Sequence, residues 1–406
     1  MVENTLTIIL AGGTGTRLFP LTANRAKPAV PFGGIYRIID FTLSNCLHSG
    51  LRRILVLTQY KSHSLQKHLR DGWFIFNPEI GEYITTVPAQ MRTGEGWYAG
   101  TADAIYQNRF LLERSQAKLV LVLAGDHIYR MDYARMIEEH QQRKFDVTVA
   151  CVPVPRADAR FFGVMEVDDN LRIQKFIEKP QVTPSTGDSS DQTLASMGIY
   201  VFDLAVLLEI LHKDHEDNAS GHDFGKNILP KNLATYTIGA YRFGGVEGRV
   251  TQDRYWRDVG TIDAYYEANM DLLKAIPPLD LYQKDWVIRT YHAQYPSARM
   301  VPSESGEDGL IANAILASGD VIIGARLTHS ILSPDVWVRS GAVVDDSILF
   351  ERVQIGPGAR LRRCIIDKDV HVPPKETIGM DFEQDRRRFT VSEGGVVVVP
   401  KGYQFA

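Results

Sequence analysis

Cysteine is scarce in this chain, which has only Cys46, Cys151 and Cys364 among its 406 residues. The three are scattered, and no two of them form a C-x-x-C pair. Their number and spacing argue against a disulfide framework and against a structural zinc site. We interpret them as buried thiols.

Long apolar runs are missing as well. The N-terminal sequence MVENTLTIIL holds an apolar stretch far shorter than a membrane span, and neither a charged leader nor a small-residue cleavage site precedes it. These absences predict a cytoplasmic protein without a membrane partner.

Low-complexity segments and long blocks of like charge are also absent. The composition, 44% hydrophobic and 23% charged, is typical of a globular protein. The formal net charge is −4. A slightly acidic chain is not expected to bind nucleic acid through its overall charge.

Acidic residues are nearly absent between positions 17 and 70, where Asp40 is the only acid beside nine lysines and arginines. A basic segment in an acidic protein indicates that a compact polyanion binds locally, and phosphates are the commonest such ligand. A solvated basic face is the alternative. The nine cations are Arg17, Arg25, Lys27, Arg37, Arg52, Arg53, Lys61, Lys67 and Arg70.

The length favours one large domain followed by a smaller one. In the first 275 residues, β-branched runs at 6–10, 54–58, 119–123 and 147–152 alternate with helical patterns. This alternation predicts an α/β fold with a mostly parallel, Rossmann-like sheet that is covered on both faces. In such sheets, ligands bind beyond the carboxyl ends of the strands.

The texture of the sequence changes after residue 275, where Pro277 and Pro278 break a helical pattern and an irregular, aromatic-rich segment follows. We therefore expect a catalytic domain at 1–275, a linker at 276–302 and a second domain at 303–406.

The second domain contains a repeat of seventeen residues. The tripeptides SIL at 330–332, SIL at 347–349 and CII at 364–366 follow one another at this offset, and aliphatic residues elsewhere keep it. Such a period predicts the stacked coils of a parallel β-helix. A β-sandwich is the alternative, but it would not need so regular a period.

The first predicted strand leads into LAGGTGTRL at 10–18. Its glycines allow backbone N–H groups to approach a phosphate, and we expect the N-terminus of a following helix to add a favourable dipole. The GK[ST] sequence of a P-loop is absent, and Leu18 occupies the place of the third glycine of a dinucleotide fingerprint. Arg17 and Lys27 add two cations close to the turn.

Two acids are candidates for a metal site. Asp126 follows the third predicted strand, and Asp258 lies in the sequence YWRDVG. Two carboxylates suit Mg²⁺, which takes its other ligands from phosphates and water. The alternative for Asp126 is a helix cap. We interpret His127 as structural because no second histidine lies at metal-binding spacing.

Glu178 and Lys179 lie where an extended run stops at Pro180. Glu178 is suited to accept hydrogen bonds from hydroxyl groups, and Lys179 to bind a phosphate. A surface ion pair is the alternative, and this motif alone does not exclude it.

Taken together, these motifs resemble those of the glucose-1-phosphate adenylyltransferases, or ADP-glucose pyrophosphorylases, of bacterial glycogen synthesis. The resemblance spans nearly the whole chain. It is carried by LAGGTGTRL (10–18), RAKPAV (25–30), FGG (32–34), RIIDF (37–41), SNC (44–46), TQY (58–60), GW (72–73), WY (97–98), GTADA (100–104), AGDHIY (124–129), FGV (162–164), EKP (178–180), LASMGIY (194–200), HDFG (222–225) and YWRDVG (255–260).

The resemblance implies a nucleotidyltransferase domain, a left-handed β-helix and Mg²⁺ held by Asp126 and Asp258. The reaction implied is that of ATP with glucose 1-phosphate to give ADP-glucose and pyrophosphate. The implied catalytic residues are Arg17, Lys27 and Asp126. The implied nucleotide-binding residues are Gly12, Gly13, Gly15, Thr16, Gln90, Tyr98 and Gly100. For glucose 1-phosphate they are Tyr98, Gly163, Glu178, Lys179, Ser196, Tyr200 and Asp258.

The family resemblance also implies a homotetramer and regulation by metabolites. Fructose 1,6-bisphosphate as activator and an AMP-type inhibitor are the expected effectors, although Ile35 replaces a lysine that enterobacterial relatives link to activator response. We expect a bisphosphate site where the 17–70 segment meets the basic cluster at 386–388. The candidate residues are Arg37, His48, Arg52 and Arg386.

Two other functions remain open at this point. The same scaffold serves enzymes that use another nucleoside triphosphate and another sugar 1-phosphate. A non-catalytic regulatory subunit would bind the same ligands without turnover, but the main charged residues of the expected site are all present here.

Overall fold

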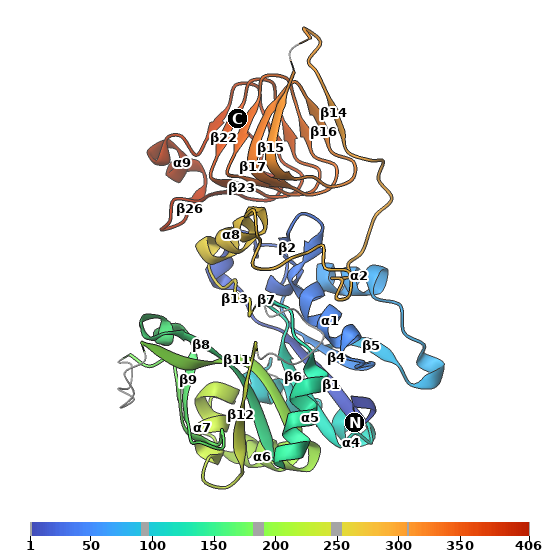
Figure 1. Ribbon diagram of the computed structural model, residues 1–406, viewed down its shortest axis with the longest axis vertical. Coiled ribbons are helices and arrows are strands. Elements are labelled where there is room, and N and C mark those ends of the chain that lie inside the picture. The colour runs from blue at the N-terminus through green and yellow to red at the C-terminus, as the bar shows by residue number, and fades with distance from the viewer. Residues whose placement is uncertain (1, 91–96, 182–190, 245–253, 307, 406) are drawn as a thin grey trace.

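The computed structural model describes residues 2–90, 97–181, 191–244, 254–306 and 308–405. Figure 1 shows two bodies stacked along the long axis of the molecule: an α/β body that carries the N-terminus, and a β-helix that carries the C-terminus. An extended segment connects them along one side. Among the described residues, no helix is both long enough and apolar enough to cross a bilayer.

The α/β body is built on a nine-stranded sheet with the main order β10-β9-β11-β6-β1-β4-β5, and β8 and β12 pair beside β11. Strands β6, β1, β4 and β5 are parallel, whereas β11 runs antiparallel to β6. The strands are β1 Thr5–Ala11, β4 Arg53–Thr58, β5 Tyr83–Pro88, β6 Leu119–Ala124, β8 Val147–Pro155, β9 Gly163–Val167, β10 Ile173–Glu178, β11 Gln192–Asp203 and β12 Ile238–Arg242.

Helices cover both faces of this sheet, as predicted. Successive residues of a strand point to opposite faces, so Ile8 and Val122 belong to one buried core whereas Ile9 and Leu121 belong to the other. The helices of this body are α1 Ile38–His48, α2 His63–Gly72, α3 Thr101–Tyr106, α4 Arg109–Arg114, α5 Tyr133–Arg143, α6 Leu204–Glu216, α7 Leu229–Asn232 and α8 Ile262–Met270.

Two short ribbons lie beside the main sheet. β2 Pro31–Phe32 pairs with β3 Tyr36–Arg37, and β7 His127–Tyr129 pairs antiparallel with β13 Trp256–Asp258. The second ribbon places Asp258 opposite His127. It therefore joins two segments that are far apart in the sequence.

The C-terminal body confirms the predicted β-helix. Arg326, Val343, Arg360 and Thr377 are aligned in parallel on successive strands, seventeen residues apart. This parallel pairing excludes the β-sandwich. Its strands are β14 Arg299–Val301, β15 Leu310–Ile315, β16 Val321–Ile323, β17 Arg326–Leu332, β18 Trp337–Val338, β19 Val343–Asp345, β20 Ile348–Leu349, β21 Gln354–Ile355, β22 Arg360–Arg362, β23 Cys364–Ile366, β24 His371–Val372, β25 Thr377–Ile378, β26 Thr390–Val391 and β27 Val397–Val399; α9 spans Phe382–Arg388.

The repeat also extends to the backbone at the coil corners. Asp335, Arg352 and Asp369, again seventeen residues apart, have φ angles of 65°, 63° and 63°. Asp tolerates this left-handed region better than most residues, but Arg does not. The corner conformation is therefore set by the stacking of the coils rather than by the preference of each side chain.

The two bodies share a hydrophobic core. Ile331, Ile348 and Ile365, from successive coils, are buried in one cluster with Phe32 of β2 and Tyr265 of α8. The buried ion pair between Arg25 Nη2 and Asp367 Oδ1, at 2.7 Å, adds a polar contact across the same interface. The domain boundaries at 275 and 302 stay predictions.

Candidate active site

A cleft of about 730 Å³ opens at the carboxyl ends of β1 and β6, where the sheet topology predicts a ligand site. The sequence-predicted residues that line it are Gly12, Gly13, Gly15, Thr16, Arg17, Lys27, Tyr98, Gly100, Asp126, Glu178, Lys179 and Tyr200. Gln90, Gly163, Ser196 and Asp258 are not part of this lining, although the last three lie near residues that are.

The glycine-rich turn forms one wall of the cleft. Gly15 has a φ of 63°, and the Thr22 hydroxyl donates a 2.8 Å hydrogen bond to its carbonyl. A methyl group added to Gly13 would meet no atom within 4 Å, so this part of the turn faces open space. A phosphate can therefore approach its backbone N–H groups closely.

The prediction that a helix dipole acts at this turn is wrong. The turn is followed by η2, a single 3₁₀ turn that spans only Thr16–Leu18. So short an element has too few aligned peptide groups for a useful macrodipole. The exposed side chain of Arg17 and the buried Lys27 are left as the positive groups beside the turn.

Lys27 lies between the two candidate metal carboxylates. Its Nζ is 3.0 Å from Asp126 Oδ2 and 3.0 Å from Asp258 Oδ1. Burial alone would lower the pKa of Lys27, but the two carboxylates outweigh burial and raise it. Burial would raise the pKa of Asp126, but Lys27 and His127 outweigh burial and lower it to about 2. Lys27 and Asp126 are therefore both charged at neutral pH.

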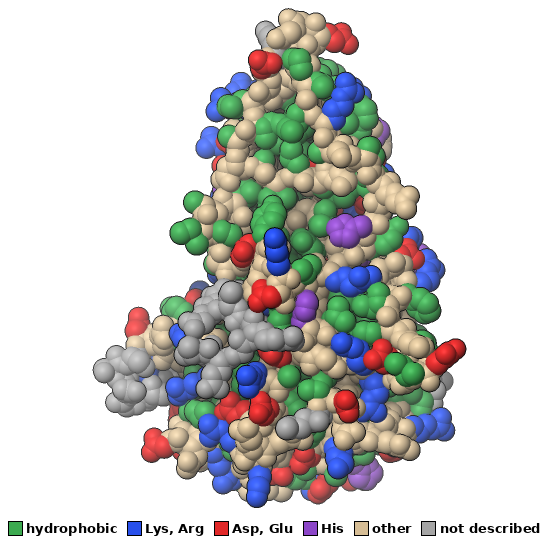
Figure 2. Space-filling view, turned by 45° about the vertical axis from the view of Figure 1, so that its right-hand side comes forward, with side chains coloured by type: hydrophobic (Ala, Val, Ile, Leu, Met, Phe, Trp, Pro, Cys, Tyr) green, Lys and Arg blue, Asp and Glu red, His purple; other side chains and the backbone are tan. Residues whose placement is uncertain are grey.

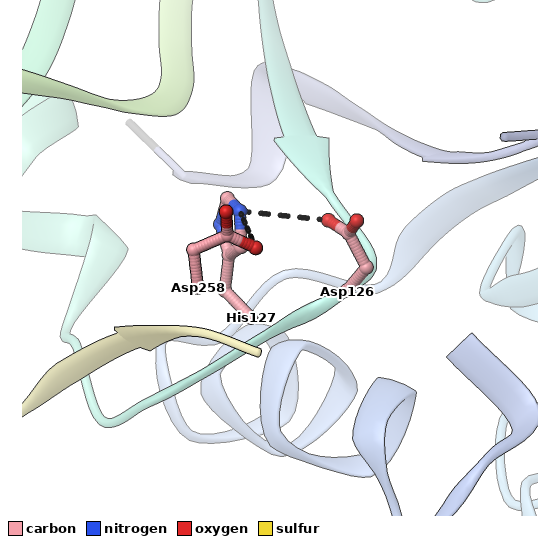
Figure 3. Close-up of side chains that lie close together, drawn as sticks. All are labelled: Asp126, His127 and Asp258. Carbon is pink, nitrogen blue, oxygen red and sulfur yellow. Dashed lines mark ion pairs between the residues drawn. The ribbon is translucent and has the colours of Figure 1, made fainter. Parts of the chain in front are cut away.

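His127 lies beside this cluster. Its Nε2 is 3.6 Å from Asp126 Oδ1 and 3.9 Å from Asp258 Oδ1, and Figure 3 shows the three side chains converging. One ligand atom from each residue lies within 4.8 Å of the others. Two carboxylates and one imidazole fit a divalent cation. The interpretation of His127 as purely structural therefore lacks support from this geometry.

The opposite wall carries the predicted acid and cation. Glu178 ends β10, and Lys179 Nζ lies 3.3 Å from Glu178 Oε1. The Glu178 carboxylate is confined by two glycines: methyl groups added to Gly163 or Gly225 would lie 2.6 Å or 2.5 Å from Oε2. Both glycines thus hold open the space that the carboxylate occupies.

Aromatic residues close the base of the cleft. The Tyr98 hydroxyl accepts a 2.9 Å hydrogen bond from Asn108 Nδ2 on the loop before α4. Tyr200 on β11 packs against Phe224, with ring centroids 5.4 Å apart. Burial raises the pKa of both tyrosines, so both stay neutral hydrogen-bonding groups at neutral pH.

The sequence analysis missed several lining residues. Asp223, Phe224 and Gly225 belong to the HDFG motif, and Tyr60 to TQY, but neither motif was given a role. The signal lay in the motifs themselves. Their position in the cleft depends on a long-range contact between the loop before η6 (Phe224–Ile228) and α3. In this contact the Ala102 N–H donates to the carbonyl of His222 at 2.8 Å.

A second cavity, here called the interdomain cavity, has a volume of about 340 Å³ and lies between the two bodies. Of the predicted regulatory residues, only Arg37 lines it. Its other lining cations are Arg25, Lys67, Arg352, Lys368 and Lys401.

The structure does not bring the other predicted regulatory residues into this cavity. His48 stacks on Trp286, and Arg52 hydrogen-bonds the carbonyls of Leu47 and Leu51 at the far end of α1. Arg386 pairs with a glutamate of its own helix α9, which Figure 1 places on the opposite side of the molecule from α2. The basic clusters at 17–70 and 386–388 therefore do not come together within one chain, and this prediction is wrong.

Charged residues elsewhere are mixed. On the face shown in Figure 2, basic and acidic side chains alternate over the α/β body and do not gather into one large basic patch. Nothing on this face favours a polyanion as long as a nucleic acid.

Residues 6–275 match the family model described as Nucleotidyl transferase, and residues 296–399 match the one described as GlmU-like, C-terminal hexapeptide. The chain is similar to two proteins named glucose-1-phosphate adenylyltransferase 2. It is 58% identical over 405 residues to that of Vibrio cholerae and 60% identical over 404 residues to that of Vibrio vulnificus, with 100% of both chains covered in each case. The glucose-1-phosphate adenylyltransferase of Koribacter versatilis is 48% identical over 406 residues, which cover 99% of this chain and 96% of the relative.

Proposed function

The chain belongs to the glucose-1-phosphate adenylyltransferases, and we propose that its cleft joins ATP to glucose 1-phosphate, giving ADP-glucose and pyrophosphate. The family, the fold class and the nucleotidyltransferase activity predicted from the motifs are confirmed. We further propose that the ADP-glucose serves glycogen synthesis. A cytoplasmic location stays a prediction.

One observation supports this reaction most strongly: a single cleft has a phosphate-sized glycine turn on one wall and an acid–lysine pair on the other. The turn, with Arg17, suits the triphosphate. Glu178 is placed to accept hydrogen bonds from sugar hydroxyls, and Lys179 to bind the sugar phosphate. The two walls thus suit the two substrates.

In the proposed reaction, a phosphate oxygen of glucose 1-phosphate attacks the α-phosphorus of ATP. The new O–P bond forms as the bond from the α-phosphorus to the bridging oxygen breaks, and pyrophosphate leaves with that bonding pair. The cleft orients the two substrates in line, and its cations stabilise the charge that spreads over the transferred group. This reaction requires no nucleophile from the protein.

We propose Mg²⁺ as the divalent ion, held by Asp126 and Asp258 with His127 beside them. It would neutralise phosphate charge and act as a Lewis acid. Asp258 supports this role although it does not line the cleft, because it shares the Lys27 ammonium with Asp126.

The base-binding side rests on fewer contacts. Tyr98 and Gly100 line the cleft beside the turn, whereas Gln90 is exposed outside the lining. A methyl group on Gly100 would lie 2.2 Å from the carbonyl of His222, so only glycine fits here. We propose that this tight contact shapes the nucleotide side of the cleft.

The interdomain cavity supports a second function, the binding of a regulatory anion. Arg37 donates to the carbonyl of Ala29 at 2.6 Å, and no ion pair to it occurs among the described residues. Burial lowers the pKa of Lys368 to about 8, with a further contribution from Arg37. Arg37 from the α/β body and Lys368 from the β-helix, which pairs with Glu351, together suit a phosphorylated effector.

A bisphosphate such as fructose 1,6-bisphosphate is the proposed activator, and an AMP-type nucleotide the proposed inhibitor. An effector that bridges the two bodies can shift the α/β body only by its differential affinity for two arrangements. Ile35 also lines this cavity, so the cation that the resemblance led us to expect there is absent.

A homotetramer is proposed from the family resemblance. Among the described residues, β15 pairs only with β17, and Leu310 at its start is 51% exposed. An open strand edge with an apolar side chain is suited to contact another copy. Multi-angle light scattering of the full chain is expected to give the mass of four copies, and a monomer would contradict this.

The proposed reaction is tested by pyrophosphate release from the purified chain, with each nucleoside triphosphate supplied against several sugar 1-phosphates. ATP with glucose 1-phosphate is expected to give the highest kcat/KM. A faster pair would replace the proposed substrates, and binding without turnover for every pair would indicate the regulatory subunit.

A further inference from the structure

Lys27 occupies the position between the two carboxylates that are proposed to hold the metal. Its side chain is 9% exposed, and its ammonium bonds both carboxylates at equal distances of 3.0 Å. The contact joins three segments: η3 (Lys27–Ala29), the loop after β6 and the end of β13. Two carboxylates so close to each other repel unless a cation lies between them.

The stem of Lys27 lies against the glycine turn. A methyl group added to Gly15 would lie 3.3 Å from Lys27 Cβ, so the lysine leaves the backbone beside the proposed phosphate site. Four rotatable bonds separate its Cα from Nζ. A change of rotamer can therefore move the ammonium from the carboxylates toward the glycine turn without movement of the backbone.

We propose that Lys27 is a positioning residue that holds Asp126 and Asp258 together in the nucleotide-free enzyme and excludes the divalent ion until a triphosphate draws the ammonium away. This inference rests on the proposed function, because it takes the triphosphate as the group that accepts Lys27. It explains why one lysine contacts both metal ligands.

The order of events follows from competition for the same oxygens. Mg²⁺ loses its water reluctantly and is usually held by one or two carboxylates together with substrate phosphates. With Lys27 on the carboxylates, an ion that arrives alone must displace a buried ammonium that has no other acceptor in the part of the chain that the structure describes. With the triphosphate present, Lys27 gains that acceptor. Metal and nucleotide therefore enter together, and each raises the affinity for the other.

The test is a titration of the full chain with Mn²⁺ in the absence of nucleotide. Electron paramagnetic resonance measures the concentration of the free ion at each step. Lys27→Met introduces an unbranched side chain one atom shorter than that of lysine, and it removes the charge. This variant is expected to bind Mn²⁺ about tenfold more tightly than the parent. Lys179→Met removes one positive charge from the same cleft but has Glu178 as its partner, so it controls for general electrostatics and should bind Mn²⁺ like the parent.

Two further variants secure the interpretation. Asp126→Asn added to Lys27→Met should abolish the gain, which would place the ion at these carboxylates. Lys27→Gln provides the same test if Lys27→Met does not fold, as judged by circular dichroism. Addition of α,β-methylene-ATP should tighten Mn²⁺ binding far more in the parent than in Lys27→Met.

Equal or weaker Mn²⁺ binding by Lys27→Met and Lys27→Gln would overturn the inference, and so would a gain of the same size in Lys179→Met. Because the readout is metal binding and not turnover, it is independent of the substrate assay. A chain that makes ADP-glucose but shows no gain would refute this inference alone. A gain in a chain that makes no ADP-glucose would refute only the proposed reaction.

Discussion

The cleft and the interdomain cavity differ in how their charges are matched. Three cations and three acids line the cleft, whereas six cations and two acids line the interdomain cavity. In the cleft, Lys27 is neutralised by two carboxylates. In the interdomain cavity, the Arg37 guanidinium donates to the backbone carbonyl of Ala29, and no ion pair to it occurs among the described residues.

This difference indicates two kinds of anion binding. A cleft with matched charges suits a polyphosphate that arrives with its own divalent ion, since each partner exchanges one set of ionic contacts for another. In the interdomain cavity, five of the six cations pair with carboxylates, so Arg37 is the group from which a free anion can gain charge-assisted hydrogen bonds directly. The predictions below break or sharpen this contrast.

Asp126→Asn should have the largest effect, because an amide supplies no negative charge to hold the metal or to orient Lys27. We expect the turnover number to fall about a hundredfold or more at saturating Mg²⁺, with the fold intact by circular dichroism. Asp71→Asn, the same change in the lining of the interdomain cavity, is the control and should leave turnover intact. Near-normal turnover of Asp126→Asn would reject the metal site.

Lys179→Ala should separate the two walls of the cleft. Its contact with the sugar phosphate is equal in the ground and transition states, so KM for glucose 1-phosphate should rise about tenfold while KM for ATP stays nearly constant. Lys175→Ala is a matched control, because this lysine is also half-exposed on β10 and pairs with Glu166. A change in KM for ATP instead would mean that the two substrate sites have been interchanged.

The double change Lys67→Ala and Lys401→Ala removes one partly exposed lysine from each side of the interdomain cavity. Initial rates are measured at subsaturating ATP with a panel of glycolytic phosphates. The half-activating concentration should rise about fivefold, and the basal rate should stay unchanged. Arg386→Ala should respond like the parent. The opposite pattern would return the regulatory site to α9.

The last prediction concerns pH. The pKa of Lys368 is lowered to about 8, first by burial and then by Arg37. The ammonium is charged below this pKa and neutral above it, so anion binding should weaken as pH rises. Calorimetric titration with sulfate, whose charge is constant, should show affinity falling by up to about tenfold between pH 7 and pH 9. Lys368→Arg should remove this dependence, and a pH-independent parent would contradict it.

The features predicted most accurately from the sequence are those that repeat along the chain or are made of contiguous residues. The seventeen-residue period predicted the register of the β-helix, because each coil stacks on its neighbour at a fixed sequence distance. The glycine turn was found because its residues are contiguous. The short 3₁₀ turn that follows it was not predicted, because the length of a helix depends on the residues that pack against it.

Long-range contacts could not be derived in this way. Asp258 meets Asp126 through the pairing of two three-residue strands, which have no periodicity to detect. Arg37 does not meet Arg386 as expected; it lines a cavity with Lys368 and Lys401, which only the docking of the β-helix brings near. The sequence showed the basic residues but not which of them face one another.

The central claim is that the cleft transfers the nucleotidyl group in one in-line step, by positioning and charge and without a protein nucleophile. The most direct measurement uses the Sp diastereomer of ATPαS with glucose 1-phosphate, followed by assignment of the configuration at the α-phosphorus of the product by phosphorus-31 magnetic resonance. A single displacement predicts inversion. Retention would mean two displacements through a covalent nucleotidyl-enzyme, and would contradict the mechanism derived from this cleft.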